Sequence, residues 1–232
     1  MLWLGFEFCV EGWMAMAVSQ IVEWLDAFKL VPVVALESHC SAEPLAEALV
    51  EGGLPCAEIT LRTDEAIEGI RTLAQRDDFL VGAGTVHSVA QAQQVVDAGA
   101  RFVVSPGLNP KTVQWCLDHH VPVFPGVSTP TDLEMALEFG LTVVKFFPAE
   151  AMGGVRMLRA LSGPYGGVRF MPTGGIRQEN LRQYLALPQV IACGGSWMVK
   201  SEWIQQGDFE TITRLTSEGL ELAGVPKRKR LP

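Results

Sequence analysis

Residues 80–107, LVGAGTVHSVAQAQQVVDAGARFVVSPG, carry the pattern that decides the fold. Two short apolar runs, LVGAGT at 80–85 and FVVSPG at 102–107, each end in turn residues. Between them, SVAQAQQVVDAGA at 88–100 spaces its apolar residues three and four apart, which is typical of an amphipathic helix. Two strands separated by one helix predict a parallel βαβ crossover and an α/β fold.

The same alternation recurs along the chain. The other apolar runs of this kind are PVVAL (32–36), CAEITL (56–61), VPVFPG (121–126), VVKFFP (143–148), RFMPTG (169–174) and VIACGG (190–195). Eight strand–helix units of about 22 residues fit a closed (β/α)8 TIM barrel better than an open doubly wound sheet. We expect the barrel domain to span residues 18–224. A preceding helix, from about Ser19 to Lys29, is expected to cap the barrel bottom.

The composition is that of a soluble, acidic protein. Of its 232 residues, 48% are hydrophobic and 19% are charged, which is typical of a chain that buries a sizeable core. The net charge of −8 repels anions, so we expect no nucleic-acid partner, and an anionic substrate needs a locally positive site. The basic tail at 225–232, which contains PKRKRLP, is interpreted as a solvated terminus rather than a polyanion-binding segment.

The N-terminal segment and the cysteines bear on the cellular location. MLWLGFEFCVEGWMAMAV is apolar, but Glu7 and Glu11 interrupt it, so neither a membrane span nor a signal peptide is expected. Residues 1–17 are either an extension packed on the barrel or lie upstream of an effective start at Met14 or Met16. The five cysteines form no CxxC pair, so we interpret most of them as reduced, buried thiols of a cytoplasmic protein.

Polar side chains interrupt the apolar strands near their carboxyl ends, where a barrel gathers its chemistry. They are Glu58, Thr60, Arg62, Thr85, Ser105, Lys145, Thr173 and Ser196. Lys145 is preceded by Val143 and Val144 and followed by Phe146 and Phe147. Burial among these side chains disfavours the charged ammonium form of a lysine. The neutral amine form can attack a ketone. The alternative is a lysine whose head reaches water at the strand end or forms a structural ion pair.

Strand parity suggests partners for this lysine. Glu58 and Arg62 share one face of their strand, and we expect that face to meet Lys145 inside the barrel. Glu58 is then a candidate general acid and base, or alternatively a structural counter-ion. Arg62 suits a substrate carboxylate, although a surface arginine is the competing interpretation.

Glycine pairs follow the seventh and eighth strands, in PTGGI and CGGSW. Glycines allow backbone N–H groups to approach an anion closely, and barrels often bind phosphate with these two loops. We therefore expect a phosphate site at Gly174, Gly175, Gly194, Gly195 and Ser196. A single glycine pair would be weak support, because glycine also simply forms turns.

Seven motifs in this order resemble the KDPG/KHG aldolases, class I enzymes that act on 2-keto-3-deoxy-6-phosphogluconate (KDPG) and 4-hydroxy-2-oxoglutarate (KHG). They are EITLRT (58–63), VGAGTV (81–86), SPGLNP (105–110), PGVSTPTD (125–132), KFFPAE (145–150), PTGGI (172–176) and GGSW (194–197). The resemblance covers roughly residues 20–224. It implies a metal-free and cofactor-free lyase, typically a homotrimer, that takes a small phosphorylated 2-keto sugar acid.

The resemblance also implies a role for each matching residue. Lys145 forms the Schiff base and Glu58 is the acid/base, acting partly through water. Arg62, Thr85 and Thr173 hold the carboxylate or hydroxyls of the keto acid. The remaining implied contacts are Pro106 and Phe147 against the pyruvyl portion, and Gly174, Gly175, Gly195 and Ser196 around the phosphate.

Three other functions are compatible with parts of the sequence. A phosphate-binding isomerase or epimerase would use Glu58 without a covalent intermediate. A metal-dependent aldolase would need ligands, but the four histidines show no ligand spacing at strand ends. A sugar-acid or polyanion-binding protein would bind without releasing pyruvate. The preference between KDPG and KHG, and the stereochemistry at C4, depend on geometry that the sequence does not give.

Overall fold

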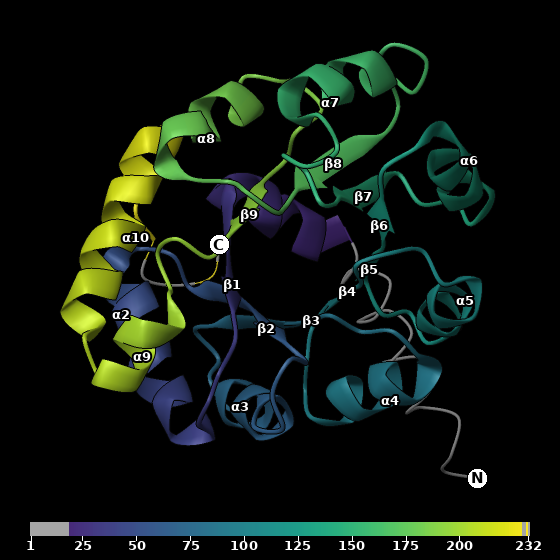
Figure 1. The fold of residues 1–232 in the computed structure, drawn as a ribbon. Coiled ribbons are helices and arrows are strands. Elements are labelled where there is room, and N and C mark those ends of the chain that lie inside the picture. The colour runs from purple at the N-terminus through teal and green to yellow at the C-terminus, as the bar shows by residue number, and fades with distance from the viewer. Residues whose placement is uncertain (1–18, 229–230, 232) are drawn as a thin grey trace, which may run out of the picture.

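The fold is known from a computed structural model that describes residues 19–228 and residue 231 (Figure 1). The strands are β1 (Leu30–Val34), β2 (Cys56–Thr60), β3 (Leu80–Gly84), β4 (Val103–Val104), β5 (Val123–Phe124), β6 (Gly126–Val127), β7 (Val143–Phe146), β8 (Arg169–Pro172) and β9 (Cys193–Gly195). The helices are η1 (His39–Ser41), α2 (Ala42–Gly52), α3 (Ala66–Leu73), α4 (Val89–Asp97), α5 (Pro110–Asp118), α6 (Pro130–Glu138), α7 (Gly154–Ser162), α8 (Gln178–Leu185), α9 (Ser201–Gln206) and α10 (Phe209–Ala223). Residues 19–28 form a further helix before β1.

The strands form a curled, parallel arrangement, and helices surround it (Figure 1). One sheet has the order β5-β4-β3-β2-β1-β9 and the other β6-β7-β8. Every described strand pair is parallel, as single-helix crossovers require. The predicted α/β fold, with a helix after nearly every strand, is therefore confirmed.

The fifth predicted strand differs in detail. VPVFPG forms two short strands, β5 and β6, on either side of Pro125. Proline has no N–H to donate, so the ladder is interrupted at this position. The Pro125 carbonyl still accepts a hydrogen bond from the Lys145 backbone N–H at 3.0 Å. Two isolated parallel bridges, Phe170 to Val190 and Thr173 to Gly194, also join β8 to the segment that contains β9.

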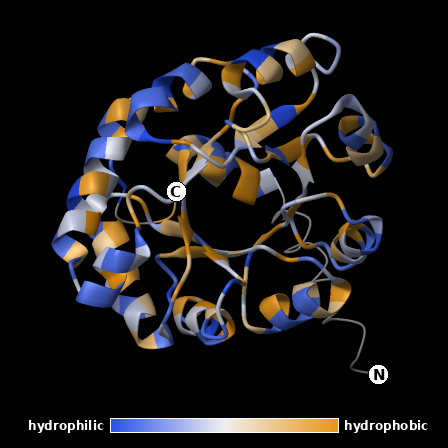
Figure 2. Cartoon of the chain, viewed as in Figure 1, coloured by the Kyte–Doolittle hydropathy of each residue, from blue (hydrophilic) through white to orange (hydrophobic). Residues whose placement is uncertain are grey.

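Burial on both faces explains why the sequences of the strands are nearly continuous runs of apolar residues. Every residue of β1, β2 and β3 is buried, because one face lies inside the curled sheet and the other lies under the helices. In Figure 2 the hydrophobic colour concentrates on the strands and on the inward faces of the helices, and the hydrophilic colour on the outside. The core therefore continues on both sides of the sheet.

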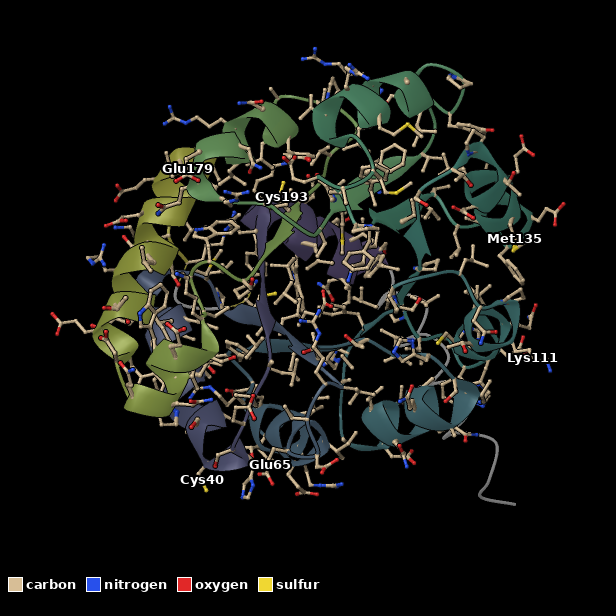
Figure 3. All side chains as sticks on the ribbon, in the orientation of Figure 1. Cys40, Glu65, Lys111, Met135, Glu179 and Cys193 are labelled. Atoms are coloured by element: carbon tan, nitrogen blue, oxygen red, sulfur yellow. The ribbon has the colours of Figure 1, made fainter. Side chains whose placement is uncertain are left out.

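The prediction that most of the cysteines are buried is confirmed among the described ones, of which three are buried and one is exposed. Cys56, Cys116 and Cys193 are buried, and burial raises the pKa of the Cys116 thiol to about 12. Cys40 is exposed; Figure 3 shows it at the edge of the molecule, with Cys193 in the interior. Cys40 lies in η1, on a loop that the strand pattern does not cover. Cys9 is outside the described residues.

The sequence also led to predictions for the N-terminal extension and for the basic C-terminal tail. The extension at 1–17 lies outside the described residues. In the tail, the Arg228 N–H donates to the Gly53 carbonyl at 2.7 Å and Lys227 Nζ lies 3.2 Å from Glu221 Oε1, so its first part packs against the domain. None of the described helices is long and apolar enough to cross a membrane.

Two glycines in β3 fit the interior of the sheet. A Cβ built on Gly82 would lie 2.2 Å from the ring of Phe102, which is fully buried. A Cβ built on Gly84 would lie 2.0 Å from Glu58 Oε1. The side chains of Phe102 and Glu58 thus occupy the space that these glycines leave empty.

Gly82→Ala is expected to lower the free energy of unfolding by about 1–3 kcal/mol, because the added methyl group overpacks the Phe102 ring. Urea denaturation followed by circular dichroism measures this change. Gly167→Ala is the matched control, since a Cβ at Gly167 meets nothing within 4 Å. Equal midpoints for Gly82→Ala and the control would contradict the packing argument.

Candidate active site

Lys145 lies near the end of β7, and its side chain is buried. The residue is 5% exposed, and its backbone pairs with Gly126 on one side and Met171 on the other. Its Nζ lies 5.0 Å from the centroid of the Phe147 ring, which covers one side of the amine. The interpretation of Lys145 as a lysine whose head reaches water is therefore excluded.

Glu58 brings a carboxylate to this amine from β2. Its Oε1 lies 3.4 Å from Lys145 Nζ, and Glu58 is 1% exposed. Lys145 and Glu58 are 87 residues apart in sequence and belong to different sheets, so only the curl of the strands brings them together. The prediction that both side chains face the same interior is confirmed.

The surroundings of the pair are apolar or uncharged. Cys56 precedes Glu58 on the same face of β2, and burial followed by the charge of Glu58 raises the pKa of the Cys56 thiol well above its usual value. Thr60, fully buried on that face, donates its hydroxyl to the Val34 carbonyl at 2.7 Å. Water is thus largely excluded from the ion pair. In such a site, removing either partner leaves a charge with little compensation.

Arg62 does not join the pair as strand parity predicted. The residue is exposed and lies two positions beyond Thr60, the last residue of β2, where alternation no longer applies. Among the interactions of the described residues, no hydrogen bond or ion pair joins Arg62 to Lys145. Arg62 instead lines a hollow of about 290 Å³ that also includes Ser196 and Lys200.

Lys200 is a functional candidate that sequence reasoning missed. It follows GGSW by three residues and precedes α9, so its position just after a glycine-rich strand end was the available signal. Its Nζ lies 4.9 Å from the centroid of the Trp203 ring. Together, Lys200 and Arg62 give this hollow two positive charges, with Glu202 as a negative one.

Two predicted threonines follow the ends of β3 and β8. Thr85 has a φ of 63°, which is uncommon for a β-branched residue and is the kind of local strain that gathers at functional sites. Thr173 is 6% exposed and packs against Gly194, where a Cβ would lie 2.3 Å from its Oγ1. The sequence named both residues as candidates but did not indicate the strained backbone at Thr85.

Pro106 and Phe147 are half-buried residues that follow β4 and β7. The Pro106 carbonyl packs against Gly126, where a Cβ would lie 2.1 Å from the oxygen. The Phe147 N–H donates to the Val127 carbonyl at 3.2 Å. Phe147 is therefore placed beside the amine, whereas no described contact joins Pro106 to it.

The predicted phosphate residues fall into two loops. Gly174 and Gly175 have φ values of 98° and 80°, in the region that favours glycine. Gly195 packs under the Trp197 ring, 1.7 Å from where a Cβ would lie, and Ser196 beside it is exposed. The parallel bridge from Thr173 to Gly194 brings the two loops side by side.

The described residues contain no group of three or more His, Cys, Asp or Glu side chains that could hold a metal ion. The polar groups in the interior are instead an amine, a carboxylate and hydroxyls. An amine next to a carboxylate can form an imine with a ketone while the carboxylate exchanges protons.

Comparison with known proteins agrees with this chemistry. The family model described as KDPG and KHG aldolase matches residues 21–215. A protein of Treponema pallidum named 2-dehydro-3-deoxy-phosphogluconate aldolase is 53% identical over 206 residues, which are 88% of this chain and 98% of that protein. The KHG/KDPG aldolase of Escherichia coli is 44% identical over 193 residues, 83% of this chain and 91% of that protein.

A solved structure gives the same result. It is a KDPG aldolase from Legionella pneumophila in which pyruvate is captured at low pH as a covalent carbinolamine intermediate. It has a TM-score of 0.83 and 41% sequence identity, and the match covers 85% of this chain and 96% of that one. These matches confirm the family that the sequence motifs predicted, and this chain belongs to the KDPG and KHG aldolase family.

Proposed function

We propose that this enzyme cleaves 2-keto-3-deoxy-6-phosphogluconate to pyruvate and glyceraldehyde 3-phosphate through a Schiff base on Lys145. The observation that carries the proposal is the buried amine 3.4 Å from the Glu58 carboxylate. The relatives named for this activity support the substrate. The relative from Escherichia coli, named KHG/KDPG aldolase, supports 4-hydroxy-2-oxoglutarate as a second substrate.

The reaction begins at the amine. Lys145 loses a proton, and Glu58 is the nearest described group to accept it. The neutral amine attacks the C2 ketone to give a carbinolamine. Glu58 then gives the proton to the carbinolamine hydroxyl, which leaves as water, so that an iminium ion and an ionised Glu58 remain. The iminium is an electron sink, so the C3–C4 bond can break while its electron pair moves into an enamine.

Glu58 is also proposed to transfer the proton of the C4 hydroxyl group. Its carboxylate accepts the C4 hydroxyl proton as the C3–C4 bond breaks, directly or through water, and glyceraldehyde 3-phosphate leaves. Glu58 gives this proton to C3 of the enamine, and water hydrolyses the resulting iminium, which releases pyruvate and the ammonium form of Lys145. Phe147, beside the amine, packs against the apolar methyl group and helps to exclude bulk water.

The substrate contacts are proposed from the resemblance to the aldolase family. Arg62, Thr85 and Thr173 are proposed to hold the carboxylate and hydroxyls, and Pro106 is proposed to pack with Phe147 against the pyruvyl portion. The phosphate is proposed to lie at Gly174, Gly175, Gly195 and Ser196. Lys200 shares a hollow with Ser196 and supplies a positive charge that the glycines lack.

We further propose that the two sheets form one closed (β/α)8 barrel. The hydrogen bond from Lys145 N–H to the Pro125 carbonyl supports continuity at one seam, and the Phe170–Val190 and Thr173–Gly194 bridges support it at the other. Val22 and Asp26 of helix 19–28 line a hollow with Val123 and Val143, which begin β5 and β7. This shared lining supports a helix that caps the barrel bottom.

The assembly and location remain proposals as well. The family resemblance supports a homotrimer, which light scattering on the purified protein would test. The free, buried thiols support a reducing, cytoplasmic location. We propose that the catalytic domain spans residues 18–224. This range includes the family match at residues 21–215.

Lys145→Ala is expected to abolish pyruvate release, because no covalent intermediate can form without the amine. Glu58→Gln is expected to lower kcat by about 10²–10⁴-fold, because the amide cannot accept the C4 hydroxyl proton. A coupled lactate dehydrogenase assay measures both changes. The control is Lys111→Ala, an exposed lysine of α5. Appreciable turnover by Lys145→Ala would contradict the covalent mechanism and favour a non-covalent one.

Lys200→Gln is expected to raise KM for the phosphorylated substrate by about tenfold, with little change in kcat, because a charged hydrogen bond to phosphate is lost. The salt dependence of kcat/KM should weaken in parallel. Steady-state kinetics at several ionic strengths measure both effects, with Lys227→Gln as the control lysine. An unchanged KM would remove Lys200 from the phosphate site.

A further inference from the structure

Glu150 and Tyr184 form a hydrogen-bonded pair next to the Gly174–Gly175 loop. Glu150 lies in the segment that follows β7, and Tyr184 lies on α8, fully buried. The Tyr184 hydroxyl donates to Glu150 Oε1. Burial, the hydrogen bond to Glu150 and then its charge raise the pKa of the Tyr184 hydroxyl well above its usual value, so the phenol stays a donor.

The Glu150 side chain packs directly against the glycine pair. A Cβ built on Gly175 would lie 2.6 Å from Glu150 Cγ and 2.7 Å from Glu150 Cβ. On the other side, a Cβ on Gly154 would lie 2.9 Å from Glu150 Oε1 and 3.0 Å from the Tyr184 hydroxyl oxygen. Although Glu150 is an exposed residue, its side chain therefore lies against both glycines, and the bond from Tyr184 holds its carboxylate there.

Backbone hydrogen bonds also join the segment after β7 to the Gly174–Gly175 loop. The Ala149 N–H donates to the Thr173 carbonyl at 2.8 Å, and the Glu150 N–H donates to the Gly174 carbonyl at 3.1 Å. Asn180 Nδ2 donates to the Gly175 carbonyl at 3.0 Å. Three successive carbonyls are thus each held by a specific donor.

These bonds determine where the N–H groups of the loop point. In a planar trans peptide the N–H points opposite to the carbonyl of the same unit. Because the Thr173 and Gly174 carbonyls turn toward residues 149–150, the N–H groups of Gly174 and Gly175 turn to the other side of the loop. Successive N–H groups held in this way make an anion-binding concavity.

We propose that Glu150 and Tyr184 are positioning residues that hold the Gly174 and Gly175 peptides in the orientation that binds the phosphate of the substrate. This inference rests on the proposed function, because it requires a phosphorylated substrate in that loop. Glu150 acts through its shape and its acceptor oxygen. Its negative charge repels a phosphate, so the charge itself does not contribute to binding.

The test compares Tyr184→Phe, Glu150→Ala and Glu150→Gln. Tyr184→Phe removes one hydroxyl, and Glu150→Ala removes the side chain that supports Gly175. Both are expected to raise KM for KDPG about tenfold with kcat nearly unchanged, because a part-buried hydrogen bond that orders the loop is lost. Glu150→Gln keeps the shape and the acceptor, so its KM should stay within about twofold of the parent or fall.

Tyr165→Phe is the matched control, because it removes the same kind of tyrosine–glutamate bond, to Glu134 Oε1 at 2.9 Å, at another site. Thermal unfolding shows whether each variant is folded, and Tyr184→Phe decides the question if Glu150→Ala is not. An unchanged KM in Tyr184→Phe, or a Glu150→Gln variant as impaired as Glu150→Ala, would overturn the proposal.

Two measurements separate this inference from the proposed function. Exchange of the pyruvate methyl protons with deuterated water, followed by NMR, reports the Schiff base without any phosphate and should be unchanged in all the variants. Binding of inorganic phosphate, followed by calorimetry, reports the loop without any turnover and should weaken in Tyr184→Phe and Glu150→Ala only. Absent exchange in the parent would reject the proposed function, whereas normal exchange with unaltered phosphate binding would reject only the positioning role.

Discussion

The central constraint in this molecule is a lysine and a glutamate that share an interior with almost no access to water. Lys145 comes from β7 and Glu58 from β2, and their charged atoms lie 3.4 Å apart. Burying two such groups carries a desolvation penalty that apolar residues of similar size would avoid. The proposed catalytic use would explain why the site keeps them, because imine chemistry requires an amine beside a proton acceptor. The parallel strands supply the rigid frame for both groups.

Small residues make the interior possible. Gly84 leaves the volume that the Glu58 carboxylate occupies, and Gly82 does the same for Phe102. Further out, Gly174 and Gly175 adopt backbone angles that other residues avoid, and the segment after β7 holds their carbonyls. The segment that begins with Lys145, the proposed nucleophile, thus also supports the proposed phosphate loop. In the proposed mechanism, one short stretch, 145–150, therefore connects the covalent chemistry with the recognition of the phosphate end of the substrate.

The sequence predicted the parts that depend on local pattern. Apolar runs that end in glycine or proline located the strands, and a lysine flanked by Val144 and Phe146 identified the candidate nucleophile. Parity placed Glu58 correctly because it lies within a regular strand. The same rule failed for Arg62, which lies beyond the strand end, where the alternation of side chains stops. Cys40 is the exposed exception among the described cysteines, because it lies in the short helix η1, outside the strands whose apolar pattern indicates burial. The contact between Tyr184 and Glu150 joins residues 34 positions apart, and it depends on how α8 packs, which no local pattern specifies.

The account requires a covalent bond between Lys145 and a keto acid, and borohydride trapping tests it most directly. The protein is incubated with pyruvate, reduced with borohydride, digested and analysed by mass spectrometry. We predict that the peptide containing Lys145 gains the mass of one reduced pyruvate, while peptides containing the exposed Lys111 do not. An unmodified Lys145 in protein that still releases pyruvate would contradict the account.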